Sequence, residues 1–110
     1  MATEREQRIA LNEAAFRVAN ERMDTWEERH REGATEDYVC ECADPDCTEM
    51  LRLTRQQYES VRSDSRRFVV VPGHEIPDAE EVIERGESFA VVEKPESLRS
   101  LTERTDPRRA

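Results

Sequence analysis

The three cysteines of this chain lie within eight residues, at Cys40, Cys42 and Cys47. A reducing compartment keeps thiols free, and an odd number of cysteines would in any case leave one thiol unpaired. The cluster therefore does not indicate a disulfide framework. Thiolates are good zinc ligands, and a structural zinc site takes four ligands in a tetrahedron. Three sulfurs at this spacing predict a metal site that needs one more ligand.

His74 is the expected fourth ligand. It follows Pro72 and Gly73, which end a predicted strand and can turn an imidazole back toward the cysteines. The other histidine, His30, falls near the end of a predicted helix, where packing or interaction with the helix dipole is its expected role. With His74 the site has no open position, so the expected zinc is structural. A different fourth ligand, or packed or redox-active thiols without a metal, are the alternatives; mononuclear iron usually takes four cysteines.

Acidic residues surround the thiols, at Glu41, Asp44, Asp46 and Glu49. Nearby carboxylates raise the pKa of a thiol, which disfavours the reactive thiolate that a nucleophile or a redox sensor needs. A bound divalent cation reverses this effect because it stabilises thiolates directly. The acidic surroundings are therefore compatible with a metal site.

No enzymatic activity is expected from the sequence. The three glycines, Gly33, Gly73 and Gly86, stand alone, so there is no glycine-rich phosphate-binding loop. Among 26 acidic residues chance pairs are unavoidable, and such pairs are no evidence of acid–base catalysis. A nucleophilic pair of Cys47 and His74 is conceivable, but metal binding would leave no free nucleophile.

A long amphipathic helix is predicted within residues 1–34. Thr3 and Glu6 fit a capping box, and Gly33 is a natural C-terminal stop. Apolar residues recur at heptad a and d positions, with Asn12 as a polar d residue. The candidate interaction residues of this stripe are Ile9, Phe16, Ala19, Met23 and Trp26. The stripe is expected either to dock on the rest of the chain or to form a short coiled coil with a protein partner or a second copy.

Residues 35–94 are predicted to form a small zinc-binding α+β module. Strands are expected at residues 36–42, 48–53, 68–71, 81–84 and 89–93, with mainly antiparallel pairing. Thr54 is the expected N-cap of one short helix, residues 55–63. Residues 95–110 are polar and are expected to be a disordered tail. The predicted fold class is α+β: a long N-terminal helix, a small sheet and one short helix, stapled by a metal site.

Composition limits what the protein can bind. The chain has 110 residues, a net charge of −9 and 35% hydrophobic residues. Negative charge repels a phosphate backbone, so we expect no nucleic-acid partner. No apolar run is long enough to span a membrane and no signal peptide is visible, so a cytoplasmic protein is expected. A core this small often needs a metal ion or an oligomer for stability.

The motif Cys-x-Cys-x4-Cys followed by Pro-Gly-His at residues 72–74 resembles one in a family of small, uncharacterised proteins common in actinobacteria. The resemblance covers residues 11–94. The matching stretches are residues 12–22, 39–47, 53–54, 58–62, 67–74 and 91–94. It implies that the cysteines and His74 belong to one site, and it implies no particular activity.

These observations predict a non-catalytic, zinc-stabilised small protein that acts as a protein-interaction or regulatory adaptor through its N-terminal helix. The alternative is a thiol-based redox switch, in which oxidation ejects zinc and releases the helix. Both hypotheses use the same four metal-site residues, so the sequence does not separate them.

Overall fold

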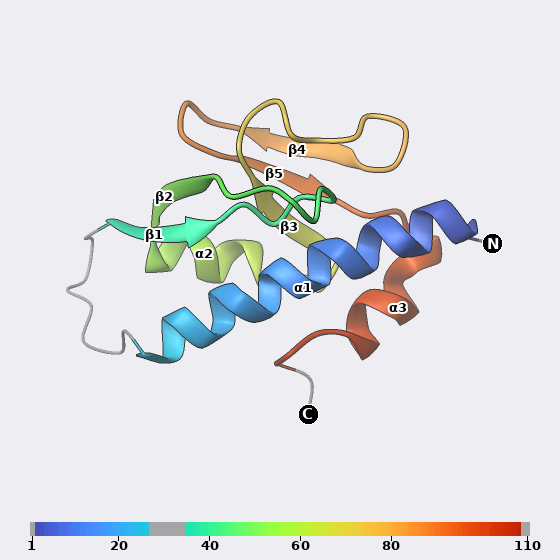
Figure 1. The fold of residues 1–110 in the computed structure, drawn as a ribbon, viewed down its shortest axis with the longest axis horizontal. Helices are drawn as coiled ribbons and strands as arrows, with labels where there is room; N and C mark the ends of the chain where they lie inside the picture. Colours follow the sequence, from blue (N-terminus) through green and yellow to red (C-terminus); the bar gives the residue numbers. More distant parts are fainter. Residues whose placement is uncertain (1, 27–34, 109–110) are drawn as a thin grey trace.

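The computed structural model describes the backbone of residues 2–26 and 35–108 and the side chains of residues 2–22 and 35–108. A long helix, α1 (Glu4–Trp26), crosses the molecule on one side of the strands (Figure 1). Its N-terminus is capped as predicted, because Thr3 Oγ1 accepts from the Glu6 backbone N–H and the Glu6 carboxylate accepts from the Thr3 N–H. The remainder of the predicted helix, with His30 and the Gly33 stop, lies outside the described residues.

Two small antiparallel sheets follow the helix. The first pairs β1 (Thr35–Val39) with β2 (Met50–Thr54), and the second has the order β3-β5-β4. The strands of the second sheet are β3 (Arg67–Val70), β4 (Glu81–Arg85) and β5 (Ala90–Glu93). Along the chain α2 (Arg55–Val61) connects β2 to β3, and its N-cap Thr54 forms a capping box with Gln57. The predicted α+β class is confirmed.

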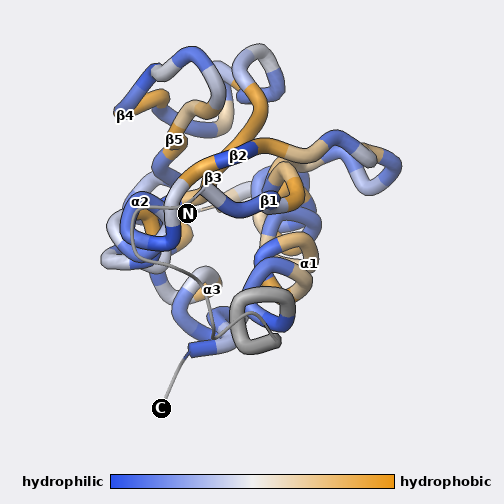
Figure 2. The backbone as a smooth tube through the Cα atoms, turned by 90° about the vertical axis from the view of Figure 1, so that its left-hand side faces the viewer, coloured by the Kyte–Doolittle hydropathy of each residue, from blue (hydrophilic) through white to orange (hydrophobic). Residues whose placement is uncertain are grey.

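The segment after β1 joins the two sheets. The Cys40 backbone N–H donates to Glu49 O at 3.1 Å, and the Glu41 N–H donates to Val69 O at 2.8 Å. Residues 40–41 therefore run between the residue that precedes β2 and the outer edge of β3. The core lies around this junction, where Tyr38 stacks on Tyr58 with ring centroids 4.5 Å apart. Figure 2 shows the apolar stretches concentrated on the strands, whereas α1 alternates between polar and apolar positions.

The buried face of α1 is not the predicted a/d stripe. Up to Arg22, its buried residues are Ile9, Ala10, Glu13, Ala14, Arg17 and Asn20. Among the stripe residues whose side chains the structure describes, Ile9 is buried, and Phe16 and Ala19 are half-buried. The side-chain amide of Asn12, the polar residue of the predicted stripe, donates to Ala43 O of the same chain at 3.1 Å. The buried face of the helix thus combines small or apolar residues with three polar or charged side chains, Glu13, Arg17 and Asn20, that contact partners elsewhere in the chain.

The C-terminal segment was predicted to be disordered, and the structure instead folds it into η1 (Glu96–Leu98) and α3 (Arg99–Arg104). Leu98 is only 1% exposed. The chain beyond α3 is held by ion pairs from Asp106 to Arg62 and from Arg108 to Glu59. The prediction failed because these anchors are charged residues, and low hydrophobicity was interpreted as an absence of tertiary contacts.

A buried ion cluster ties α1 to the second sheet. Lys94, just after β5, places Nζ 3.0 Å from a carboxylate oxygen of Glu13 on α1 and 3.0 Å from one of Glu80. All three side chains are almost fully buried. Burial raises the pKa of Glu13 well above its usual value, and the neighbouring Glu80 carboxyl raises it further. Glu13 therefore tends to keep its proton in the folded state.

This proton makes stability depend on pH in a specific direction. Because the Glu13 pKa is higher in the folded than in the unfolded chain, its contribution is complete below about pH 4.5 and is lost as pH rises toward the folded-state pKa. One such proton changes stability by at most about 1.4 kcal/mol per pH unit. Glu13→Gln mimics the protonated form, so its free energy of unfolding should fall less than the wild type's as pH rises above about 4.5. Urea unfolding of the zinc-loaded proteins measures this, with exposed Glu103→Gln as control; parallel wild-type and Glu13→Gln profiles would refute it.

Candidate metal site

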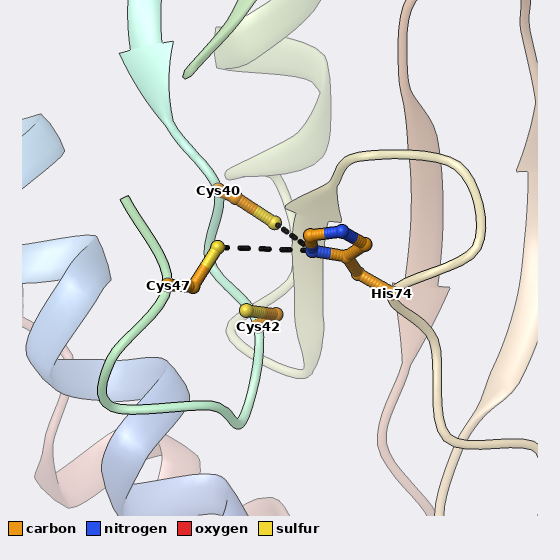
Figure 3. Close-up of side chains that lie close together, drawn as sticks. All are labelled: Cys40, Cys42, Cys47 and His74. Atoms are coloured by element: carbon orange, nitrogen blue, oxygen red, sulfur yellow. Dashed lines mark hydrogen bonds between the residues drawn. The ribbon is translucent and has the colours of Figure 1, made fainter. Parts of the chain in front are cut away.

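The structure brings Cys40, Cys42, Cys47 and His74 together. One ligand atom from each residue lies within 4.8 Å of the others. His74 Nδ1 is 3.5 Å from Cys40 Sγ and 3.7 Å from Cys47 Sγ (Figure 3). In a tetrahedral site with Zn–S bonds of about 2.3 Å and Zn–N bonds of about 2.1 Å, sulfur and nitrogen ligands lie about 3.6 Å apart. The four residues are therefore close enough to bind a metal ion, and their spacing suits zinc.

A tight turn returns Cys47 to the site. The Asp46 N–H donates to the Asp44 side chain at 2.9 Å, and the Cys47 N–H donates to Asp44 O at 3.0 Å. An aspartate that binds the backbone two residues further on is typical of such turns, and Pro45 presets the backbone for the next position. The residues between Cys42 and Cys47 thus fold the chain back so that both sulfurs face one point.

A second turn presents His74. Gly73 has φ +98°, a conformation that other residues adopt only with strain. The His74 N–H donates to Val71 O at 2.9 Å and closes the turn. The Val71 N–H in turn donates to Cys40 Sγ at 3.2 Å, which would help to stabilise a negatively charged sulfur. The Pro-Gly-His sequence therefore holds the imidazole against the thiols, as predicted from the end of the strand.

Burial of the free thiols disfavours their reactive, charged form. Burial raises the pKa of Cys40 well above its ordinary value, and the neighbouring Cys42 and Cys47 groups raise it further. Burial also raises the pKa of Cys42. Without a cation these thiols stay protonated at neutral pH, whereas a bound divalent ion deprotonates coordinating thiols. The expected cause was a shell of carboxylates, but burial is the main cause.

Glu41 was expected to lie beside the thiols, but its side chain points away from the sulfurs into the core. Its Oε1 accepts from the Val69 N–H at 3.1 Å, and its Oε2 accepts from Asn20 Nδ2 at 2.9 Å and Tyr58 Oη at 2.8 Å. Arg17 Nε lies 3.9 Å from Oε1. Side chains alternate between the two faces of an extended segment, so the residue between two cysteines that face the metal site must face the opposite way. The alternation of Cys40, Glu41 and Cys42 in the sequence could therefore have predicted the direction of the Glu41 side chain.

Two asparagines on α1 bind the cysteine segment directly. Asn20 both donates to Val39 O at 2.9 Å and accepts from the Val39 N–H at 2.7 Å, and Asn12 donates to Ala43 O. Cys40 and Cys42 therefore lie in a segment whose backbone is bound to α1 at both ends, at Val39 and Ala43. The hydrophobic periodicity of the sequence could not predict these contacts, because Asn12 and Asn20 are polar.

The structure describes the side chains of three of the five predicted interaction residues. Ile9 is 7% exposed, whereas Phe16 and Ala19 are half-buried. The backbone of Met23 and Trp26 belongs to the last turns of α1, but their side chains lie outside the described residues. Leu11, on the outer side of the helix, is 49% exposed.

Fold and site together define a small α+β protein with a Cys3His cluster able to bind a metal ion. No known protein family, curated protein or solved structure matches the chain. The resemblance to a small actinobacterial family therefore stays a prediction. Among the described residues, no helix has the length and apolar character needed to cross a lipid bilayer.

Proposed function

We propose that this protein is a non-catalytic, zinc-stabilised small protein. The observation that carries the proposal is the cluster of four ligand atoms within 4.8 Å of one another. Three sulfurs and one nitrogen fill a zinc tetrahedron, so a bound substrate or water would have no coordination position. Zinc rather than iron is the proposed ion, because mononuclear iron–sulfur sites usually take four cysteines. Free thiols at this density suit a reducing compartment, and we propose the cytoplasm.

The cellular role that we propose is that of an adaptor whose N-terminal helix binds a second copy of this chain. The inner face of α1 is occupied by contacts within the chain, so the proposed contact lies toward its C-terminal turns, at Met23 and Trp26. Phe16 and Ala19, which are half-buried, would form the edge of this contact. The role of the metal is then to hold the loop onto which α1 docks, so that the end of the helix is presented in a fixed direction.

Replacing Met23 and Trp26 together with Gln tests the adaptor role. We expect the wild type to self-associate and the double variant to be a monomer with its zinc still bound, because neither residue belongs to the metal cluster. Sedimentation equilibrium gives the mass, and atomic absorption gives the zinc content. Leu11→Gln, on the outer face of α1, is the matched control and should leave the mass unchanged. A monomeric wild type, or equal masses for wild type and double variant, would refute self-association.

A thiol-based redox switch is the second candidate. The observation that favours it is the unequal burial of the cluster, because Cys47 is half-buried while Cys40 and Cys42 are buried. An oxidant such as hydrogen peroxide would reach Cys47 first and would remove one zinc ligand. If the protein is a switch, mild peroxide should release zinc before it unfolds the chain, and a thiol reductant should allow zinc to rebind. Zinc release only at concentrations that unfold the protein would eliminate this candidate.

A further inference from the structure

Glu49 contacts the ring nitrogen of His74 that points away from the cysteines. His74 Nε2 lies 2.7 Å from Glu49 Oε2, while Nδ1 faces Cys40 and Cys47. The position of Glu49 is itself fixed, because its backbone carbonyl accepts from the Cys40 N–H. One residue thus touches both a cysteine ligand through its backbone and the histidine ligand through its side chain.

The two nitrogens of a neutral imidazole have different roles. One carries the proton and donates a hydrogen bond, and the other has the lone pair that a metal needs. Which nitrogen carries the proton is set by the partner of each. At His74 the carboxylate of Glu49 accepts from Nε2–H, which leaves the lone pair on Nδ1, beside the sulfurs.

We propose that Glu49 is a positioning residue of the zinc site: it orients His74 and fixes the tautomer in which Nδ1 binds the metal. This inference rests on the proposed zinc site and specifies its geometry. A carboxylate that accepts from a ligating imidazole also makes the imidazole a better donor, and loss of such a partner typically weakens metal binding 10–100-fold. The contact thus links Glu49, the residue that precedes β2, to the zinc affinity of the site.

A simple surface ion pair is the competing interpretation. The Glu49 side chain is 58% exposed and that of His74 is 28% exposed. Exposed ion pairs contribute little to stability, so in that case removing Glu49 would hardly alter the protein. Zinc affinity and the tautomer of His74 distinguish the two interpretations, since neither depends on a surface ion pair.

The test uses the full-length, zinc-loaded chain and two measurements. Long-range ¹H–¹⁵N correlation spectra of the imidazoles report which nitrogen of His74 binds zinc and which is protonated, with His30→Gln used to assign the signals. Competition with a chelator of known affinity gives the zinc dissociation constant. The variants are Glu49→Ala and Glu49→Gln, and Asp46→Asn is the matched control because it removes an exposed carboxylate from the same loop.

We expect wild-type His74 to bind zinc through Nδ1 with Nε2 protonated. Glu49→Ala should raise the zinc dissociation constant about 10–100-fold. Glu49→Gln should recover part of the loss because its amide oxygen still accepts from Nε2–H, and Asp46→Asn should match the wild type. Zinc bound through Nε2, or equal affinities for Glu49→Ala and Asp46→Asn, would overturn this inference and leave the zinc site standing. A wild type that binds no zinc would overturn both.

Discussion

Removal of the metal is expected to unfold residues 35–94. Apolar residues are scarce in this chain, and the segment carrying three of the ligands also joins the two sheets. Structural zinc contributes about 10–16 kcal/mol of apparent binding free energy in small zinc-finger peptides. The whole stability of a small domain is typically about 5–15 kcal/mol. Loss of the ion therefore removes a free energy as large as the stability itself.

The effect should extend to α1, because Asn12 and Asn20 bind the backbone of the cysteine segment. Circular dichroism and amide NMR spectra, recorded before and after treatment with an excess of chelator, measure the change. We expect dispersed amide signals to collapse after chelation and to return on addition of zinc, but not of magnesium, which prefers oxygen ligands. A protein that keeps its dispersed spectrum after all metal has been removed would refute a structural role for the ion.

Replacing Glu41 with alanine is expected to destabilise the zinc-loaded protein by about 3–5 kcal/mol, the usual cost of removing one partner from a buried charge pair. The change leaves three donors, on Val69, Asn20 and Tyr58, without an acceptor in the core. It also leaves the guanidinium of Arg17, which is 1% exposed, without its nearest carboxylate. Each unsatisfied buried group costs about 1–3 kcal/mol.

Urea unfolding of zinc-loaded protein measures this cost, with Glu103→Ala on α3 as an exposed control expected to change stability by less than about 0.5 kcal/mol. Glu41→Gln separates hydrogen bonding from volume, because it fills the same space but replaces one acceptor oxygen with a donor. It should also destabilise the protein. Equal stabilities of Glu41→Ala and Glu103→Ala would mean that the Glu41 network does not support the metal loop.

The sequence predicted the metal cluster because three of its four ligands are local. Three sulfurs within eight residues need little tertiary structure to converge, and the Pro-Gly turn indicated His74 as the fourth ligand. The tertiary fold, through the contact of Glu41 with β3, brings His74 to the cysteines from 27 or more residues away. The approximate positions of the strands were also predictable from local patterns, namely runs of β-branched residues bounded by turn residues. The α+β class was therefore predictable from short-range patterns alone.

The docking of α1 was not predictable from such patterns. Periodicity analysis counts apolar residues, whereas this helix buries Glu13, Arg17 and Asn20 against partners that are distant in the sequence. A buried charge is tolerated only where its partner is close, and that closeness is a property of the tertiary fold. The same reason explains the C-terminal segment, where Arg62 and Asp106, far apart in the sequence, form an ion pair.

Native mass spectrometry of the full-length protein tests the central claim most directly. We predict one zinc ion per chain in the wild type, loss of that ion in His74→Ala, and its retention in His30→Ala. Wild-type protein that carries no metal after expression with zinc, or equal zinc retention in the two histidine variants, would contradict the assignment of Cys40, Cys42, Cys47 and His74 as the zinc ligands.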